Sequence, residues 1–194
     1  NKALAVAGII LSGIAPMLTN APDTDQVGLF SYLMVVMLGT LWIVFVTKWR
    51  ELSLYALLLV VVYSIPHFLG LVFSAQKDLL LLFAFAFTAL ILLANMVSLI
   101  RNMTLPSVAE VSVVLGNGLF LIVWILTAGQ EEWQSLLLVM WMMVFASASF
   151  AASRVSQKRE IFYAHGTVAV VMLVAATAAE LDGASLTLAY IVES

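Results

Sequence analysis

The chain has 194 residues, of which 64% are hydrophobic and only 10% are charged, whereas globular proteins average roughly 45–50% apolar and about 25% charged residues. A soluble domain of this composition could not cover its core, so the mean hydropathy of +1.13 predicts an integral membrane protein. The lack of cysteine excludes disulfides, thiolate metal sites and cysteine nucleophiles, and a net charge of only −3 gives no reason to expect a nucleic-acid partner.

Seven apolar stretches are each long enough to cross a bilayer as a helix, which takes about 20 residues. They lie near 3–19, 28–47, 52–73, 79–100, 107–128, 133–153 and 161–179, and the start of an eighth lies at 184–194. The polar breaks between them are short, so neighbouring helices run antiparallel. We expect an all-α, polytopic transmembrane bundle forming a single helical region over 1–194, as an excerpt of a longer protein.

Basic residues predict the orientation, because lysine and arginine in short loops stay on the cytoplasmic side of a membrane. One side of the predicted bundle collects Lys2, Lys48, Arg50, Arg101, Arg154, Lys158 and Arg159, and the other side has only Lys77. The loops of the second side are acidic, which ordinary loop solvation explains. We therefore predict a multi-pass protein of the cytoplasmic (inner) membrane with a cytoplasmic N-terminus.

The first loop contains Asp23-Thr24-Asp25, an exterior acidic candidate site. It is similar to the acidic first loop of membrane glycosyltransferases that use polyprenyl-linked sugars. Two aspartates beside Asn20 and Pro22 are also an ordinary turn composition, and this simpler interpretation is preferred.

In the third stretch, His67 follows Pro66. The proline leaves the backbone carbonyl of Val62 without its helical hydrogen bond, next to a titratable ring. Kinks of this kind often line cavities. We prefer the alternative in which Ser64 or a neighbour satisfies the kink and His67 lies near the exterior interface; a lone histidine makes no metal site.

Two asparagines lie inside predicted spans. Asn95 and Asn117 could each bridge two helices by amide hydrogen bonds worth about 0.6 to 2 kcal/mol. The flanking glycines in Gly116-Asn117-Gly118 could also mark a locally unwound helix of the kind that binds ions in transporters.

Two carboxylates also fall within the predicted spans, where a charge at the helix centre costs about 2.5 to 3.5 kcal/mol. Glu110 could approach Arg101 or cap the N-terminus of its helix, where negative charge is favoured. Glu193 would reach mid-membrane if the eighth helix continues, either as a functional group or as a carboxylate bonded to a neighbouring helix.

The last two complete spans carry a packing signal and an interfacial signal. Small residues recur through Ala146-Ser147-Ala148-Ser149 and Ala151-Ala152-Ser153, which predicts a tight helix-helix seam. His165 is expected at the membrane interface, with Phe162 and Tyr163 as aromatic-belt residues.

Three segments in order carry a family resemblance: Ala7-Gly8-Ile9-Ile10-Leu11-Ser12-Gly13-Ile14-Ala15-Pro16-Met17-Leu18-Thr19, then Leu29-Phe30-Ser31-Tyr32-Leu33, then Lys48-Trp49-Arg50-Glu51-Leu52. They resemble the DUF2339 family of predicted bacterial membrane proteins, in which a glycine-rich helix ending in proline precedes a Phe-x-Tyr-Leu span and a basic-tryptophan-basic turn. Near the end, Leu188-Ala189-Tyr190-Ile191-Val192-Glu193 is similar to a later family segment, with Tyr190 where tryptophan is commoner. The resemblance implies a long bacterial protein with many spans, and it carries no activity.

No glycine-rich phosphate loop, His-Glu-x-x-His pattern or serine nucleophile elbow appears, so we expect no catalytic residue, cofactor or metal, and an enzyme is the less favoured class. The leading interpretation is a non-enzymatic component of the bacterial cell envelope. Its partners would be the lipid bilayer and other envelope membrane proteins or the rest of its own chain. A small-solute or ion transporter or channel using Glu193, His67 and Asn117 is the alternative, and a lipid-linked sugar transferase using Asp23 and Asp25 is the second alternative.

Overall fold

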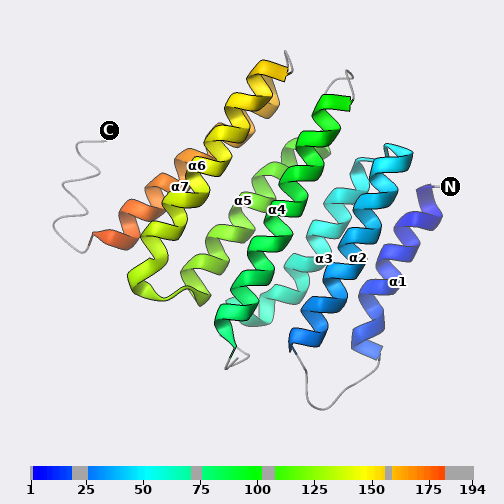
Figure 1. The fold of residues 1–194 in the computed structure, drawn as a ribbon. Helices are drawn as coiled ribbons and strands as arrows, with labels where there is room; N and C mark the ends of the chain where they lie inside the picture. Colours follow the sequence, from blue (N-terminus) through cyan, green and yellow to red (C-terminus); the bar gives the residue numbers. More distant parts are fainter. Residues whose placement is uncertain (1, 19–25, 71–75, 102–107, 156–158, 182–194) are drawn as a thin grey trace.

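The computed structural model describes residues 2–18, 26–70, 76–101, 108–155 and 159–181. Within these ranges the chain forms seven α-helices and no strand (Figure 1): α1 Lys2–Leu18, α2 Gln26–Thr47, α3 Glu51–Phe68, α4 Lys77–Arg101, α5 Val108–Ala128, α6 Glu131–Val155 and α7 Arg159–Glu180. The all-α class is confirmed. The helices α2 to α7 are long and apolar enough to cross a membrane, and α1 is a shorter apolar helix. The eighth stretch expected at 184–194 lies outside the described residues.

Successive helices alternate between two layers. The helices α2, α4 and α6 pack in one layer, α3, α5 and α7 pack in the other, and α1 covers the edge beside α2 and α3 (Figure 1). The central helix is α5, which packs against α3, α4, α6 and α7. Half of the residues in the most apolar 18-residue stretch of α5 are buried, against 22% of those in the corresponding stretch of α2. The core of the bundle is therefore built around α5.

Glycines let α5 approach its neighbours closely. A Cβ atom at Gly118 would lie 2.4 Å from Cγ1 of Val168 in α7, and one at Gly116 would lie 3.1 Å from a methyl carbon of Leu57 in α3. The helix α5 is continuous through Gly116-Asn117-Gly118, so the local unwinding considered from the sequence is wrong. These glycines serve close packing, as small residues commonly do between membrane helices.

The helices α6 and α7 form the most extensive helix pair of the bundle. Small side chains are buried on both sides of the seam, Ala148 and Ala152 from α6 and Ala164 from α7. The Ser149 hydroxyl donates to the backbone oxygen of Phe162 at 2.9 Å, which adds a polar contact between the two helices. The tight seam predicted from the small residues of the sixth span is confirmed.

His165 lies inside this seam. Its side chain is only 1% exposed, its ring centroid lies 6.0 Å from that of Phe145 in α6, and its Nδ1 lies 2.9 Å from the backbone oxygen of Ile161. The sequence did not predict this burial between the two helices. Depth along the helix followed from the sequence, but the face that α7 turns toward α6 did not.

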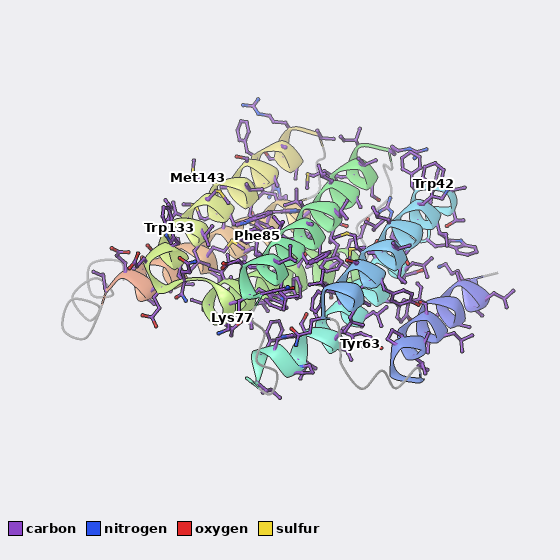
Figure 2. The ribbon with its side chains drawn as sticks, turned by 60° about the horizontal axis from the view of Figure 1, so that its bottom comes forward. Trp42, Tyr63, Lys77, Phe85, Trp133 and Met143 are labelled. Atoms are coloured by element: carbon purple, nitrogen blue, oxygen red, sulfur yellow. The ribbon has the colours of Figure 1, made fainter. Side chains whose placement is uncertain are left out.

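Large apolar side chains cover the outside of both layers. Trp42 is 68% exposed, Met143 59% and Trp133 53%, and Figure 2 shows them on the outer surface of α2 and α6. Soluble monomers rarely expose apolar patches of more than a few hundred Å². A surface of this kind is buried only when lipid surrounds it.

The basic residues gather at one end of the bundle, which we call the basic end. The described members are Lys2, Lys48, Arg50, Arg101, Arg154 and Arg159, each at a helix end or in the turn between α2 and α3. Lys77 begins α4 at the opposite end (Figure 2). The antiparallel order of the helices therefore collects charges that are far apart in the sequence.

Replacing Gly118 with alanine tests the approach of α5 to α7. The added methyl group would overlap Val168, a stiff β-branched side chain, and overpacking of this kind costs about 1 to 3 kcal/mol. We expect a lower midpoint of thermal unfolding in detergent. Gly39→Ala is the matched control, because nothing lies within 4 Å of a Cβ there and alanine favours a helix. Equal midpoints for the two variants would contradict the close contact.

Candidate functional site

Asn117 lies near the middle of α5 and is only 1% exposed. Its Nδ2 donates to the backbone oxygen of Thr88 in α4 at 3.1 Å, so the side chain bridges two helices. The Oδ1 atom of Asn117 and the Oγ1 atom of Thr88 are buried, and neither has a hydrogen-bond partner in the described part of the chain. A buried polar group left unpaired costs about 1 to 3 kcal/mol. This pair therefore places two polar atoms without a hydrogen-bond partner in the described residues inside the bundle.

His67 lies near the end of α3 that is opposite the basic end, half-buried among aromatic rings. Its ring centroid is 5.6 Å from that of Phe30 in α2 and 5.6 Å from that of Trp124 in α5. The indole Nε1 of Trp124 donates to the Ser64 hydroxyl at 3.2 Å, which ties α5 to α3. His67 thus packs beside an interhelix hydrogen bond and within an aromatic cluster.

Pro66 falls in the last turn of α3, which ends at Phe68. The Ser64 hydroxyl donates to the carbonyl of Val60 at 2.8 Å, whereas we expected it to serve the carbonyl that the proline leaves open. The helix stops soon afterwards, with Gly70 in the left-handed region at φ 65°. The proline therefore marks the end of α3, where few helical hydrogen bonds remain to be broken.

Glu110 forms an ion pair with Arg50, which lies in the turn between α2 and α3. Both side chains are largely buried, with 11% of Glu110 and 14% of Arg50 exposed. The approach of Glu110 to Arg101 that we considered is wrong. The guanidinium of Arg101 lies 4.1 Å from the centroid of the Phe45 ring and donates to the Phe45 backbone oxygen at 3.3 Å. The packing of α3 on α5 brings Arg50 to the start of α5 instead.

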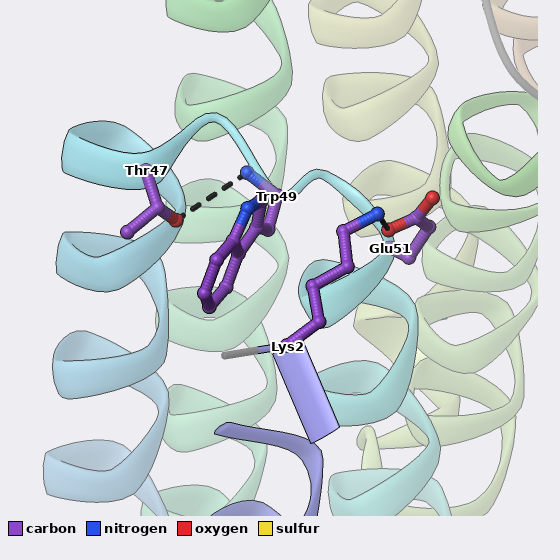
Figure 3. A network of polar contacts seen from close by, with 4 residues as sticks. All are labelled: Lys2, Thr47, Trp49 and Glu51. Carbon is purple, nitrogen blue, oxygen red and sulfur yellow. Dashed lines mark hydrogen bonds and ion pairs between the residues drawn. The ribbon is translucent and has the colours of Figure 1, made fainter. Parts of the chain in front are cut away.

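A second ion pair at the basic end is exposed. Lys2 Nζ and Glu51 Oε2 are 2.6 Å apart and join α1 to α3, with about half of each side chain accessible (Figure 3). Beside them the backbone N–H of Trp49 donates to the Thr47 hydroxyl at 3.4 Å. Because exposed pairs contribute about 1 kcal/mol at most, the pair directs α1 toward α3 without contributing much to stability.

The remaining candidates are not brought to these sites. Asn95 is half-buried on α4, seven residues or about two helical turns from Thr88, and no hydrogen bond joins its amide to another described residue. Glu193, Asp23 and Asp25 lie outside the described residues. In the described segments no three His, Asp or Glu side chains gather as a metal site would require.

A model of the family described as "Predicted membrane protein (DUF2339)" matches residues 1–194. The chain belongs to this family. The resemblance seen in its opening segments is therefore confirmed over the full length. No curated protein and no solved structure matches the chain. Its family and its apolar helices together make this DUF2339 chain a multi-pass membrane protein.

Two partners of the candidate residues escaped the sequence reasoning, Thr88 for Asn117 and Arg50 for Glu110. The bond that Trp124 donates to Ser64 was also not expected, because Ser64 was considered from the sequence only as a partner for the proline kink. A signal existed for Thr88, because it is a hydroxyl residue deep inside an apolar helix, where polar side chains usually bond to a neighbouring helix. No sequence feature distinguished Arg50 from the other basic residues of the loops.

Removing one partner of the buried ion pair tests its contribution. In Arg50→Ala the guanidinium that neutralises Glu110 is lost, and breaking a buried pair costs about 3 to 5 kcal/mol. We expect a clear drop in the midpoint of thermal unfolding, most of it recovered in the double variant Arg50→Met with Glu110→Leu, which removes both charges.

Lys2→Ala is the matched control, because it breaks the exposed pair and should cost no more than about 1 kcal/mol. A drop for Arg50→Ala no larger than that for Lys2→Ala would show that the Arg50–Glu110 pair is solvated rather than buried.

Proposed function

We propose that this DUF2339 chain is a non-enzymatic component of the bacterial cell envelope that acts through helix assembly and contacts with lipid or other membrane proteins. One observation carries the proposal: polar side chains inside the bundle join one helix to another. Asn117 bonds to α4, Trp124 to α3 and Ser149 to α7, and the hydroxyl of Tyr63 in α3 donates to the backbone oxygen of Gly13 in α1.

This use of polar groups supports a structural role. Interhelix hydrogen bonds in membranes contribute about 0.6 to 2 kcal/mol each and define the register of neighbouring helices. A transport pathway instead requires polar groups that face a common water-filled space. Here the bonds lie between different helix pairs, some across the two layers and some within one layer or to α1, so they hold the bundle together rather than line a single path.

A small-solute or ion transporter or channel is the second candidate. It is motivated by Oδ1 of Asn117 and Oγ1 of Thr88, two buried polar atoms that have no hydrogen-bond partner in the described residues. Water would have to reach these atoms during transport. The sugar-transferase alternative gains no support, because Asp23 and Asp25 lie outside the described residues.

Reactivity of single cysteines distinguishes the two candidates, and the absence of native cysteine gives a clean background. Maleimides react with the thiolate, which forms only where water is present. If the interior is packed and dry, Asn117→Cys and Thr88→Cys in membranes should remain unlabelled by N-ethylmaleimide. Gln130→Cys, in the exposed turn between α5 and α6, should react fully and serves as the positive control.

Leu119→Cys is the matched negative control, since Leu119 lies only two residues from Asn117 along α5 but is 57% exposed on the outer surface of the helix. Labelling of both Asn117→Cys and Thr88→Cys at a rate near that of Gln130→Cys would replace the scaffold proposal with transport.

The proposed location is the bacterial inner membrane with the N-terminus in the cytoplasm, supported by the collection of basic residues at one end of the bundle. Val155→Cys lies at the basic end and Gln130→Cys at the opposite end. In right-side-out vesicles an impermeant maleimide should label Gln130→Cys at once and Val155→Cys only after the vesicles are opened. The reverse pattern would invert the topology.

A further inference from the structure

A groove runs between α2 and α4 in the half of the bundle nearest the basic end. It has a volume of about 310 Å³, at the lower end of the range for small-ligand sites. Its walls are apolar, with Leu38, Leu41 and Trp42 on α2 and Leu90, Leu93 and Val97 on α4. Two cations, Lys48 and Arg101, also line it. We call it the α2–α4 groove.

The groove has the depth of one leaflet. Its lining runs from Leu38 to Lys48 on α2 and from Leu90 to Arg101 on α4. At 1.5 Å of rise per residue these stretches are about 15 to 17 Å long, or about half of the 30 Å hydrocarbon core of a bilayer. The groove therefore begins near the membrane midplane and ends, at its two cations, where lipid headgroups lie.

Aromatic packing fills the other half of the seam between α2 and α4. In the other half, the ring of Phe30 in α2 lies 6.1 Å from that of Phe83 and 6.3 Å from that of Phe87 in α4, centroid to centroid. These large rings fill the space between the helices. Toward the basic end the α4 wall has smaller side chains, with Ala94 among them, and the groove is left between the two helices.

The two cations at the groove are not paired with carboxylates in the described part of the chain. At the same end Lys2 pairs with Glu51 and Arg50 pairs with Glu110, so carboxylates are present but are used elsewhere. Arg101 is held over the Phe45 ring and bonded to the Phe45 carbonyl. These contacts orient its guanidinium without cancelling its charge.

The backbone conformation of Lys48 is a second, independent observation that points to a use for the charge of this residue at the groove. Its φ is 61°, and among the described residues it is the one non-glycine residue in the left-handed region. Glycine is the usual residue at such a helix end because it meets no steric penalty there. A strained lysine in place of glycine is consistent with a use for its charge at this position.

From the apolar wall, its depth and the two uncancelled cations, we infer that the α2–α4 groove binds an anionic membrane phospholipid, with one acyl chain along α2 and α4 and the headgroup phosphate at Lys48 and Arg101. The bilayer that surrounds this membrane protein supplies the ligand. The inference does not depend on the proposed scaffold role or on which face of the membrane the basic end occupies.

Native mass spectrometry of the whole chain tests this inference. The protein is purified in a non-ionic detergent, mixed with equal amounts of dioleoyl phosphatidylglycerol and dioleoyl phosphatidylcholine, and the retained lipid is identified. We expect one tightly held lipid, with the anionic form preferred. The double variant Lys48→Gln with Arg101→Gln should lower that preference about 25-fold, since a cation near an anionic headgroup contributes roughly 5-fold.

Arg154→Gln with Arg159→Gln is the matched control. It removes the same charge from the same end of the bundle, and Arg154 lies 4.9 Å from the Phe150 ring centroid much as Arg101 lies over Phe45, but neither residue lines the groove. We expect less than about a 2-fold change, because charges at a distance from the phosphate are screened. An equal loss in both double variants would mean general surface attraction and would overturn the inference.

Ala94→Phe tests the groove itself, since it fills the apolar wall and leaves both cations in place. It should release the lipid while the midpoint of thermal unfolding stays close to that of the unaltered chain. Should Ala94→Phe fail to fold, the headgroup preference of the unaltered chain still decides. Equal retention of the two lipids, displacement of the lipid by millimolar inorganic phosphate, or a dimer in place of bound lipid would each overturn the inference.

Discussion

The close approach of α5 to its neighbours is the contact on which the rest of the bundle depends. Gly118 and Gly116 remove the side chains that would otherwise separate α5 from α7 and α3. Between these two glycines the amide of Asn117 bonds to α4, and about two turns further along the indole of Trp124 bonds to α3. In a bilayer, where apolar side chains gain little by leaving lipid for each other, such close packing and interhelix hydrogen bonds are the main source of association.

The basic end shows how the same kind of residue takes two different roles. Arg50 is partly buried and pairs with Glu110, so its charge stabilises the junction of α3 with α5. Lys48, two residues earlier, lines the α2–α4 groove and is not paired with a carboxylate in the described residues. The difference comes from the turn between α2 and α3, whose left-handed residue is Lys48. A single tight turn therefore supplies one cation to the core and one to the lipid-facing surface.

The interior of the bundle contains both the support for a structural role and the feature that would favour transport. Its hydrogen bonds link different pairs of helices, as a scaffold requires. The oxygens Oδ1 of Asn117 and Oγ1 of Thr88 are buried there without a hydrogen-bond partner in the described residues, and polar groups inside a membrane bundle often mark an ion or solute pathway. The two interpretations differ in whether water reaches the polar atoms of α5. Access of water depends on motion of the helices as well as on their packing.

The sequence by itself determined that lipid surrounds the protein, that the fold is helical and that the basic residues gather at one end. The reason is that the length of an apolar run and the position of a lysine or arginine are local properties of the chain. It also predicted a tight seam for the sixth span from the small residues of Ala146-Ser147-Ala148-Ser149, but not that α7 would be the partner helix. Only the tertiary structure decided that Glu110 pairs with Arg50 and that His165 is buried. Both outcomes depend on which helices are neighbours and on the angle at which each faces the next. Hydropathy carries no information about that angle when nearly every face of a helix is apolar.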